Sequence, residues 1–185
     1  MWNAPYADSM RAVYDLAPDD LDVATLYADA LMNLTPWQLW DVRTGEPAEG
    51  ARTPEARAVL ERALGTPGGR GHPGVLHLYV HLMEMSPTPE TALPAADRMR
   101  RVPDAGPLLH MPSHLEVLCG DYRRVVADNS AAIAADEKFH ARAGVLLPHR
   151  HVRAGAGGHA VTLLRHGRVR PPSRLRPARR ATTVR

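Results

Sequence analysis

Five side chains that can bind a metal ion recur at the spacing of one helix turn in two segments of the sequence. His77 and His81 are four residues apart, Glu84 follows three residues later, and His110 and His114 are again four residues apart. Residues three or four apart lie on the same face of an α-helix. Two imidazoles and a carboxylate on one face suit zinc, and also iron or manganese. We therefore treat all five residues as candidate ligands of a divalent transition metal.

Two interpretations of these residues stay open at this stage. In the first, the four histidines hold a metal ion, and Glu84 is a further ligand or the general base that activates metal-bound water, so any enzymatic activity would be metal-dependent. In the second, the histidines are partly buried packing groups that hydrogen-bond to neighbouring carboxylates and backbone carbonyls. His77 is followed by Leu78. A helical zinc protease has a glutamate there, so that assignment is rejected.

The helices that must position these residues are delimited by prolines, glycines and acidic caps. Asp19 and Asp20 can cap a helix that ends before Pro36, and Thr53 and Thr88 each precede a Pro-Glu pair, a pattern typical of a helix start. The apolar spacing predicts helices over 6–16, 21–34, 53–64, 73–85, 88–101, 111–118 and 121 to about 139. Strand-like alternation is nearly absent. The sequence therefore predicts an all-α fold.

The predicted helices pair into hairpins over 20–64, 72–101 and 109–137, after a leading half-repeat. Their start signals recur every 33 to 35 residues, which favours a stacked array, because a single hairpin cannot bury its own apolar face. Gly120-Asp121-Tyr122, followed by Val125 and Ala132, resembles the turn and second helix of a tetratricopeptide repeat (TPR). Residues 21–34 likewise resemble a first helix of such a repeat.

Three longer strings carry a narrower resemblance. They are residues 36–41 (PWQLWD), residues 72–84 with His77, His81 and Glu84, and residues 110–114 (HMPSH). They resemble a bacterial family of longer, mostly uncharacterised TPR proteins, over roughly residues 1–144. The resemblance implies a right-handed superhelix, a concave face that binds a protein or peptide partner, and a chain that is a fragment of a longer array. In such an array the two histidine clusters would face each other.

Charge divides the chain into two segments. Residues 1–137 hold 11 Arg, no Lys and all 20 acidic residues, a net charge of −9, whereas residues 138–185 hold 11 Arg, one Lys and no acid, a net charge of +12. We expect residues 1–144 to form the repeat domain and residues 145–185 to be a disordered Arg/Pro/Gly tail. That tail is either an arm that binds nucleic acid through phosphates or the product of out-of-frame translation.

Other conspicuous residues have structural interpretations. His72, before Pro73, is expected to cap a helix, and Trp37 and Trp40 are expected to pack between repeats. Cys119 is the single cysteine, so the chain has no internal disulfide, and no apolar run reaches the roughly 20 residues that span a bilayer. These features predict a cytoplasmic protein. Residues 65–71 lack the Lys-Ser/Thr ending of a phosphate-binding loop, so we expect no nucleotide cofactor.

Overall fold

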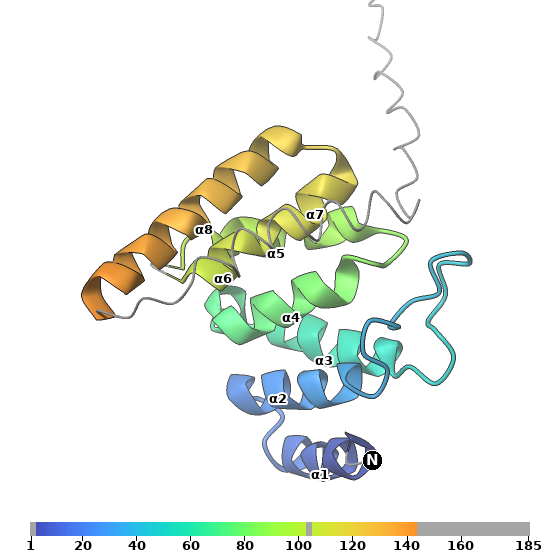
Figure 1. The fold of residues 1–185 in the computed structure, drawn as a ribbon. Helices are drawn as coiled ribbons and strands as arrows, with labels where there is room; N and C mark the ends of the chain where they lie inside the picture. The colour runs from blue at the N-terminus through green and yellow to red at the C-terminus, as the bar shows by residue number, and fades with distance from the viewer. Residues whose placement is uncertain (1–2, 103–104, 144–185) are drawn as a thin grey trace, which may run out of the picture.

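The computed structural model describes residues 3–102 and 105–143, and the fold of this part is all-helical (Figure 1). Its helices are α1 (Asn3–Leu16), α2 (Leu21–Met32), α3 (Thr53–Gly65), α4 (Pro73–Met83), α5 (Leu93–Met99), α6 (Gly106–His110), α7 (Pro112–Cys119) and α8 (Tyr122–Ala143), with 3₁₀ turns at Gly69–Gly71 and Pro89–Ala92. The predicted all-α class is confirmed for these residues. None of the described helices is both long and apolar enough to cross a membrane. The predicted tail, residues 145–185, lies outside the described residues.

The helix boundaries follow from caps, prolines and one glycine. The Asp20 carboxylate accepts hydrogen bonds from the N–H groups of Asp22 and Val23 and so caps α2. A proline occupies the first turn of each of α3, α4, α5, α6 and α7, where its missing N–H is not needed. Gly120 ends α7 with φ of 82°, a left-handed conformation that favours glycine. These are the signals that predicted most of the boundaries.

The helices stack from α1 at one end to α8 at the other, with the short helix α6 packed along α8 (Figure 1). Helix α2 packs on α3, α3 on α4, α4 on α5, α5 on α7, and α7 on α8, while α2 also contacts α4 and α4 also contacts α7. The largest fully buried side chains include Tyr27, Leu31, Leu76, Met99 and Leu115, so one core runs through the stack. Two segments that carry the candidate ligands, α4 and α7, are therefore direct neighbours.

Three local predictions were wrong. The Thr53 side chain does not cap α3, because its buried hydroxyl donates a hydrogen bond to the Leu39 carbonyl instead. The Thr88 side chain does not cap its helix, which begins as a 3₁₀ turn. A short helix, α6, forms between the predicted helices over 88–101 and 111–118, because Pro107 lies in its first turn, where a proline is tolerated.

The long connection between α2 and α3 folds back onto α4. The Trp40 indole N–H donates a hydrogen bond to the Leu82 carbonyl at 2.6 Å, and Leu39 is buried in the core. Trp37 has a positive φ of 63° and is 67% exposed. The prediction that both tryptophans pack is therefore confirmed for Trp40 and wrong for Trp37, which lies at the surface beside α4.

Candidate functional site

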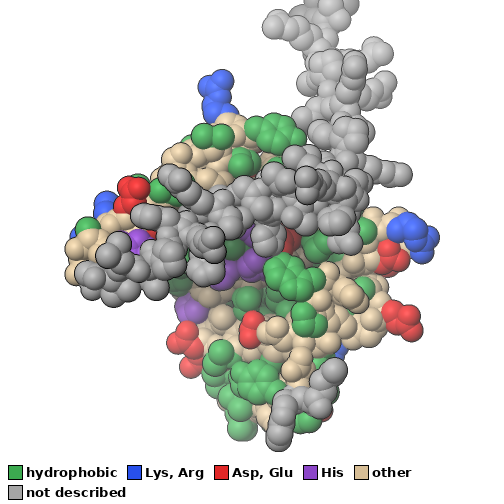
Figure 2. All heavy atoms as spheres, viewed as in Figure 1, with side chains coloured by type: hydrophobic (Ala, Val, Ile, Leu, Met, Phe, Trp, Pro, Cys, Tyr) green, Lys and Arg blue, Asp and Glu red, His purple; other side chains and the backbone are tan. Residues whose placement is uncertain are grey.

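The fold brings the two predicted clusters together. His77 and His81 lie on α4, Glu84 follows the end of α4, His110 ends α6, and His114 lies on α7. The ring centroids of His77 and His81 are 4.7 Å apart, those of His81 and His114 are 5.4 Å apart, and those of His114 and His110 are 4.8 Å apart. Figure 2 shows histidine side chains gathered on one face of the molecule. The four imidazoles form one continuous row across the α4–α7 contact.

Glu84 joins two of these imidazoles. One carboxylate oxygen, Oε1, lies 3.2 Å from His81 Nδ1, and the other, Oε2, is hydrogen-bonded to His114 Nδ1. The side chains of Glu84 and His114 are only 13% and 9% exposed. Burial by itself would raise the pKa of Glu84, but the hydrogen bonds and charges of His114 and His81 outweigh it and lower that pKa to about 2. Glu84 is therefore a buried carboxylate at neutral pH.

Asn129, on α8, fixes the proton of His110. The Asn129 amide Nδ2 donates to the Val125 carbonyl at 2.7 Å, so the amide oxygen Oδ1 is the atom that faces His110 Nδ1, also at 2.7 Å. An amide oxygen only accepts hydrogen bonds, so His110 carries a proton on Nδ1. Neutral His110 then presents Nε2 as an acceptor to the next imidazole in the row.

The proton positions on His114 follow from its two neighbours. His114 Nε2 lies 2.9 Å from His110 Nε2, so His114 donates its Nε2–H to that acceptor. The other ring nitrogen, Nδ1, faces the Glu84 carboxylate, which cannot donate. A neutral imidazole already protonated on Nε2 would turn a lone pair toward the carboxylate. With neutral imidazoles the three contacts are therefore one positive charge short, and an extra proton on His110 or His114, or a metal ion at His114 Nδ1, supplies it.

His77 and His110 lie outside the closest group of ligand atoms. Within residues 3–102 and 105–143, His81, Glu84 and His114 form the group whose donor atoms all lie within 4.8 Å of one another. Burial, followed by the positive charges of His81 and His114, lowers the pKa of His77 to about 4, so His77 is neutral at pH 7. Of the five predicted ligands, three have the geometry of direct ligands, while His110 lies behind His114 and His77 lies beside His81.

The sequence analysis did not single out Asn129 or Ser113 for this site. The Ser113 hydroxyl lies 3.2 Å from His110 Nδ1, the ring nitrogen that also contacts Asn129. The available signal was weak, because a lone asparagine in an alanine-rich helix has many uses. Other predictions fared better: His72 Nδ1 accepts a hydrogen bond from the Val75 N–H and so caps α4, as expected. Half-buried Cys119 has a thiol pKa raised by burial and then by Glu90 and Glu116, which does not favour a nucleophile.

Comparison of the chain with protein-family models, with curated proteins and with solved structures gives no match. The structural class of this protein is therefore described from its own helices and side chains. Over the described residues it is an all-helical protein in which two neighbouring helices, α4 and α7, carry a half-buried histidine–glutamate cluster.

Proposed function

We propose that this chain binds one divalent transition-metal ion through His81, Glu84 and His114. The donor atoms of the three residues lie within 4.8 Å of one another, on side chains held by two packed helices. Ligand atoms around a zinc ion lie about 2.0 to 2.2 Å from it. Binding requires side-chain rotations that bring the three donors to that distance. A zinc, iron or manganese ion suits two imidazoles and a carboxylate.

The charge requirement between His114 and Glu84 carries the proposal. The Asn129–His110–His114 chain ends at a carboxylate and needs one positive charge more than neutral imidazoles carry, which a metal ion at His114 Nδ1 would supply. The same chain is the kind of support that metal-binding histidines use, in which the second ring nitrogen donates its N–H to a fixed acceptor. In this arrangement His114 is a ligand through Nδ1, and His110 and Asn129 set its tautomer and orientation.

Three protein ligands leave a coordination position for water or a ligand molecule, as in catalytic zinc sites. A bound ion would lower the pKa of such a water and so supply a nucleophile near neutral pH. Glu84 lies between the two imidazoles, so its role in this proposal is that of a ligand, and the alternative role of general base is not supported.

The test is the metal content of the full chain. Protein purified without chelator should hold about one equivalent of a transition metal by elemental mass spectrometry, and the metal-free protein should bind one Zn²⁺ in a calorimetric titration. The His81→Ala/His114→Ala double variant should lose this ion and keep its helical circular dichroism, because neither imidazole belongs to the apolar core.

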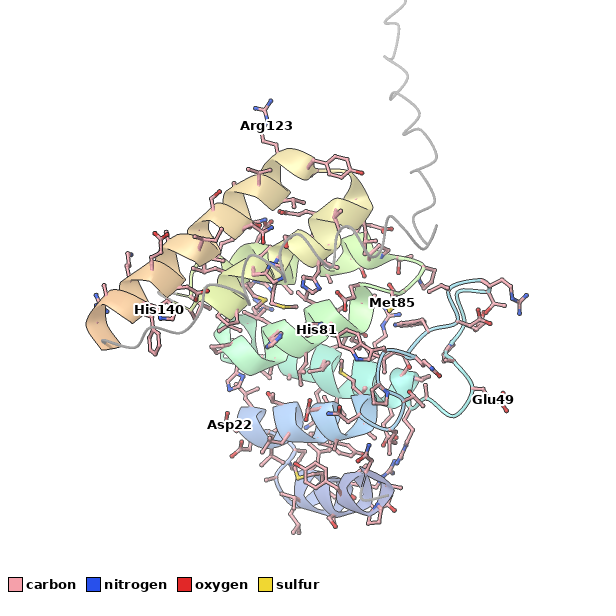
Figure 3. All side chains as sticks on the ribbon, in the orientation of Figure 1. Asp22, Glu49, His81, Met85, Arg123 and His140 are labelled. Atoms are coloured by element: carbon pink, nitrogen blue, oxygen red, sulfur yellow. The ribbon has the colours of Figure 1, made fainter. Side chains whose placement is uncertain are left out.

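His140→Ala is the matched control, since His140 lies near the C-terminal end of α8, away from His81 (Figure 3). This variant should bind Zn²⁺ as the unmodified chain does. A folded chain that binds no Zn²⁺, or a double variant that binds it unchanged, would contradict the proposal. The histidines would then be packing groups whose extra charge is a proton.

We also propose, as a second candidate function, that the helices form a TPR-like array that binds a peptide or protein partner. The supporting observation is the pattern of contacts: α2, α4 and α7 contact one another in turn, and each packs on the helix that follows it in its hairpin. Peptides selected from a display library against the full chain should cross-link to α2, α4 or α7 and should bind the His81→Ala/His114→Ala variant equally well. Cross-links confined to the other helices would contradict this function.

A further inference from the structure

A cleft of about 210 Å³ lies directly beside the histidine–glutamate cluster, between α2, α4 and the connection that follows α2. Its wall is made of Asp29, Met32, Asn33, Pro36, Trp37, Leu39, Leu78, His81, Glu84 and Met85. Figure 3 shows His81 and Met85 close to the place where the loop after α2 approaches α4. His81 and Glu84 thus belong to both the cluster and the cleft.

We propose that this cleft binds a primary amine with a short apolar body, with its ammonium group at Asp29. Binding of this amine does not rest on the proposed metal site. The charge of the wall, the apolar floor and the size of the cleft each contribute to this inference.

The charge of the cleft selects a cation. Among its wall residues, His81 and Glu84 are hydrogen-bonded to each other, and no Lys or Arg is present. Asp29 is half-buried, and its carboxylate makes no hydrogen bond or ion pair within residues 3–102 and 105–143. Asp29 also lies in the last turn of α2, where the backbone carbonyls add partial negative charge. An ammonium group would pair with this carboxylate, and a ligand anion would be repelled.

The rest of the wall selects an apolar body. Met32, Leu39, Leu78 and Met85 contribute apolar surface, and the Trp37 side chain is 67% exposed at the rim. An indole ring attracts both apolar groups and cations to its face. The cleft is smaller than the roughly 300 to 1,000 Å³ of drug-sized pockets, so it fits a fragment of roughly ten non-hydrogen atoms. Phenethylamine has this size, an aromatic ring and one ammonium group.

The decisive experiment compares phenethylamine with 2-phenylethanol, its uncharged counterpart, on the full chain in EDTA. Ligand-observed NMR titration should show phenethylamine binding at least about tenfold more tightly than the alcohol, because a half-buried carboxylate–ammonium pair adds a charge-assisted hydrogen bond. Asp29→Asn should remove this preference. Asp22→Asn, an exposed acid on the same helix but outside the cleft wall, should leave it unchanged.

Trp37→Ala provides a second variant at an exposed position and should weaken phenethylamine binding several-fold. Absence of phenethylamine binding, equal binding of the alcohol, or equal binding to Asp29→Asn would each overturn the inference. His114→Ala separates the two proposals, because His114 is not part of the cleft wall. It should lose Zn²⁺ and keep phenethylamine. Zn²⁺ binding without amine binding defeats this inference alone, and amine binding without Zn²⁺ binding defeats only the metal site.

Discussion

Two buried glutamates on neighbouring parts of the molecule have pKa values shifted in opposite directions. Glu84, beside α7, has a pKa lowered to about 2, whereas Glu116, on α7 itself, has a pKa raised to about 8. Glu84 is surrounded by imidazoles that supply hydrogen-bond donors and positive charge. For Glu116, burial is the main cause of the raised pKa, followed by a hydrogen bond and charge repulsion with Asp128.

Arg100 lies at the centre of the carboxyl cluster around Glu116, but its charge does not reverse the upward shift of the Glu116 pKa. Its guanidinium group binds Asp128 through two hydrogen bonds of 2.8 Å and also contacts Asp97 and Glu116. Arg100 thus serves three carboxyl groups, of which Asp97 also pairs with Arg124 at 3.4 Å. The buried Glu116 Oε2 atom has no donor within the described residues, and a proton on Glu116 would let this carboxyl group donate to the neighbouring Asp128 carboxylate. The number of hydrogen-bond donors available to each carboxylate, and not burial alone, therefore decides which glutamate is ionised.

The largest effect is expected when Arg100 is removed from the cluster that contains Glu116 and Asp128. Arg100→Met should lower the free energy of unfolding by about 3 kcal/mol or more, because it leaves the buried Asp128 carboxylate without a counter-charge. Urea denaturation followed by circular dichroism measures this loss. Arg101→Met, at the adjacent exposed position, is the control and should change stability by less than about 0.5 kcal/mol.

In the first cluster, Glu84→Gln should destabilise the metal-free protein at pH 7 by about 1.5 to 3 kcal/mol, since it removes a charge-assisted pair with His114. The pKa of Glu84 is lower in the folded chain than the ordinary value of 4.5. The carboxylate therefore stabilises the fold above pH 4.5, and this contribution is lost as the pH falls toward 2. Urea titrations should show a smaller difference in the free energy of unfolding between the two proteins at pH 3.5 than at pH 7. Glu49→Gln, in the exposed loop (Figure 3), is the control and should have the same free energy of unfolding as the unmodified chain at both pH values.

The support behind His114 is tested by Asn129→Ala. This variant should weaken Zn²⁺ binding about 10- to 100-fold, because His110 loses the acceptor that fixes its tautomer. Asn129→Asp, which restores an acceptor oxygen, should recover most of the affinity. Calorimetric titration measures both, with Ser130→Ala on the neighbouring exposed position as the control. Equal affinities in all three variants would mean that the chain of hydrogen bonds does not orient His114.

Glu116→Gln tests the opposite sign of pH dependence. The folded pKa of Glu116 is about 8 against an ordinary value of 4.5. Its contribution to stability is therefore fully present below pH 4.5 and is lost as the pH rises through 8. One pKa unit corresponds to about 1.4 kcal/mol. The free energy of unfolding of Glu116→Gln, taken relative to that of the unmodified chain, should therefore rise by at least about 1 kcal/mol between pH 5 and pH 8. A constant difference across this range would show that Glu116 is ionised in the fold.

The smallest effect is expected at His77. Because His77 is neutral and contacts His81 through its ring, His77→Phe keeps a ring in the same place and should change stability by less than about 1 kcal/mol. The stoichiometry of Zn²⁺ should stay at about one. Loss of the ion in this variant would place His77 among the direct ligands and would enlarge the site that we propose.

Much of the fold could be predicted because its boundaries depend on local chemistry. Asp20, the first-turn prolines and Gly120 act within a few residues of their own position, so their effect is readable in the sequence. Thr53 shows where this fails. Its hydroxyl has a distant partner, the Leu39 carbonyl, which the fold of the preceding loop supplies. Trp37 and Trp40 have the same residue type and lie three residues apart, yet Trp40 is partly buried against the core and Trp37 is exposed.

The sequence by itself determined that the candidate ligands occur in two sets, each on one helix face, because helical spacing is a local property. Only the tertiary structure decided their roles. Packing of α4 on α7 placed Glu84 between His81 and His114, and packing of α8 brought Asn129 to His110. Proton positions, charge and the cleft beside the cluster depend on partners about 20 to 50 residues away in the chain. The helical spacing of residues in the sequence does not show which of these distant residues come into contact.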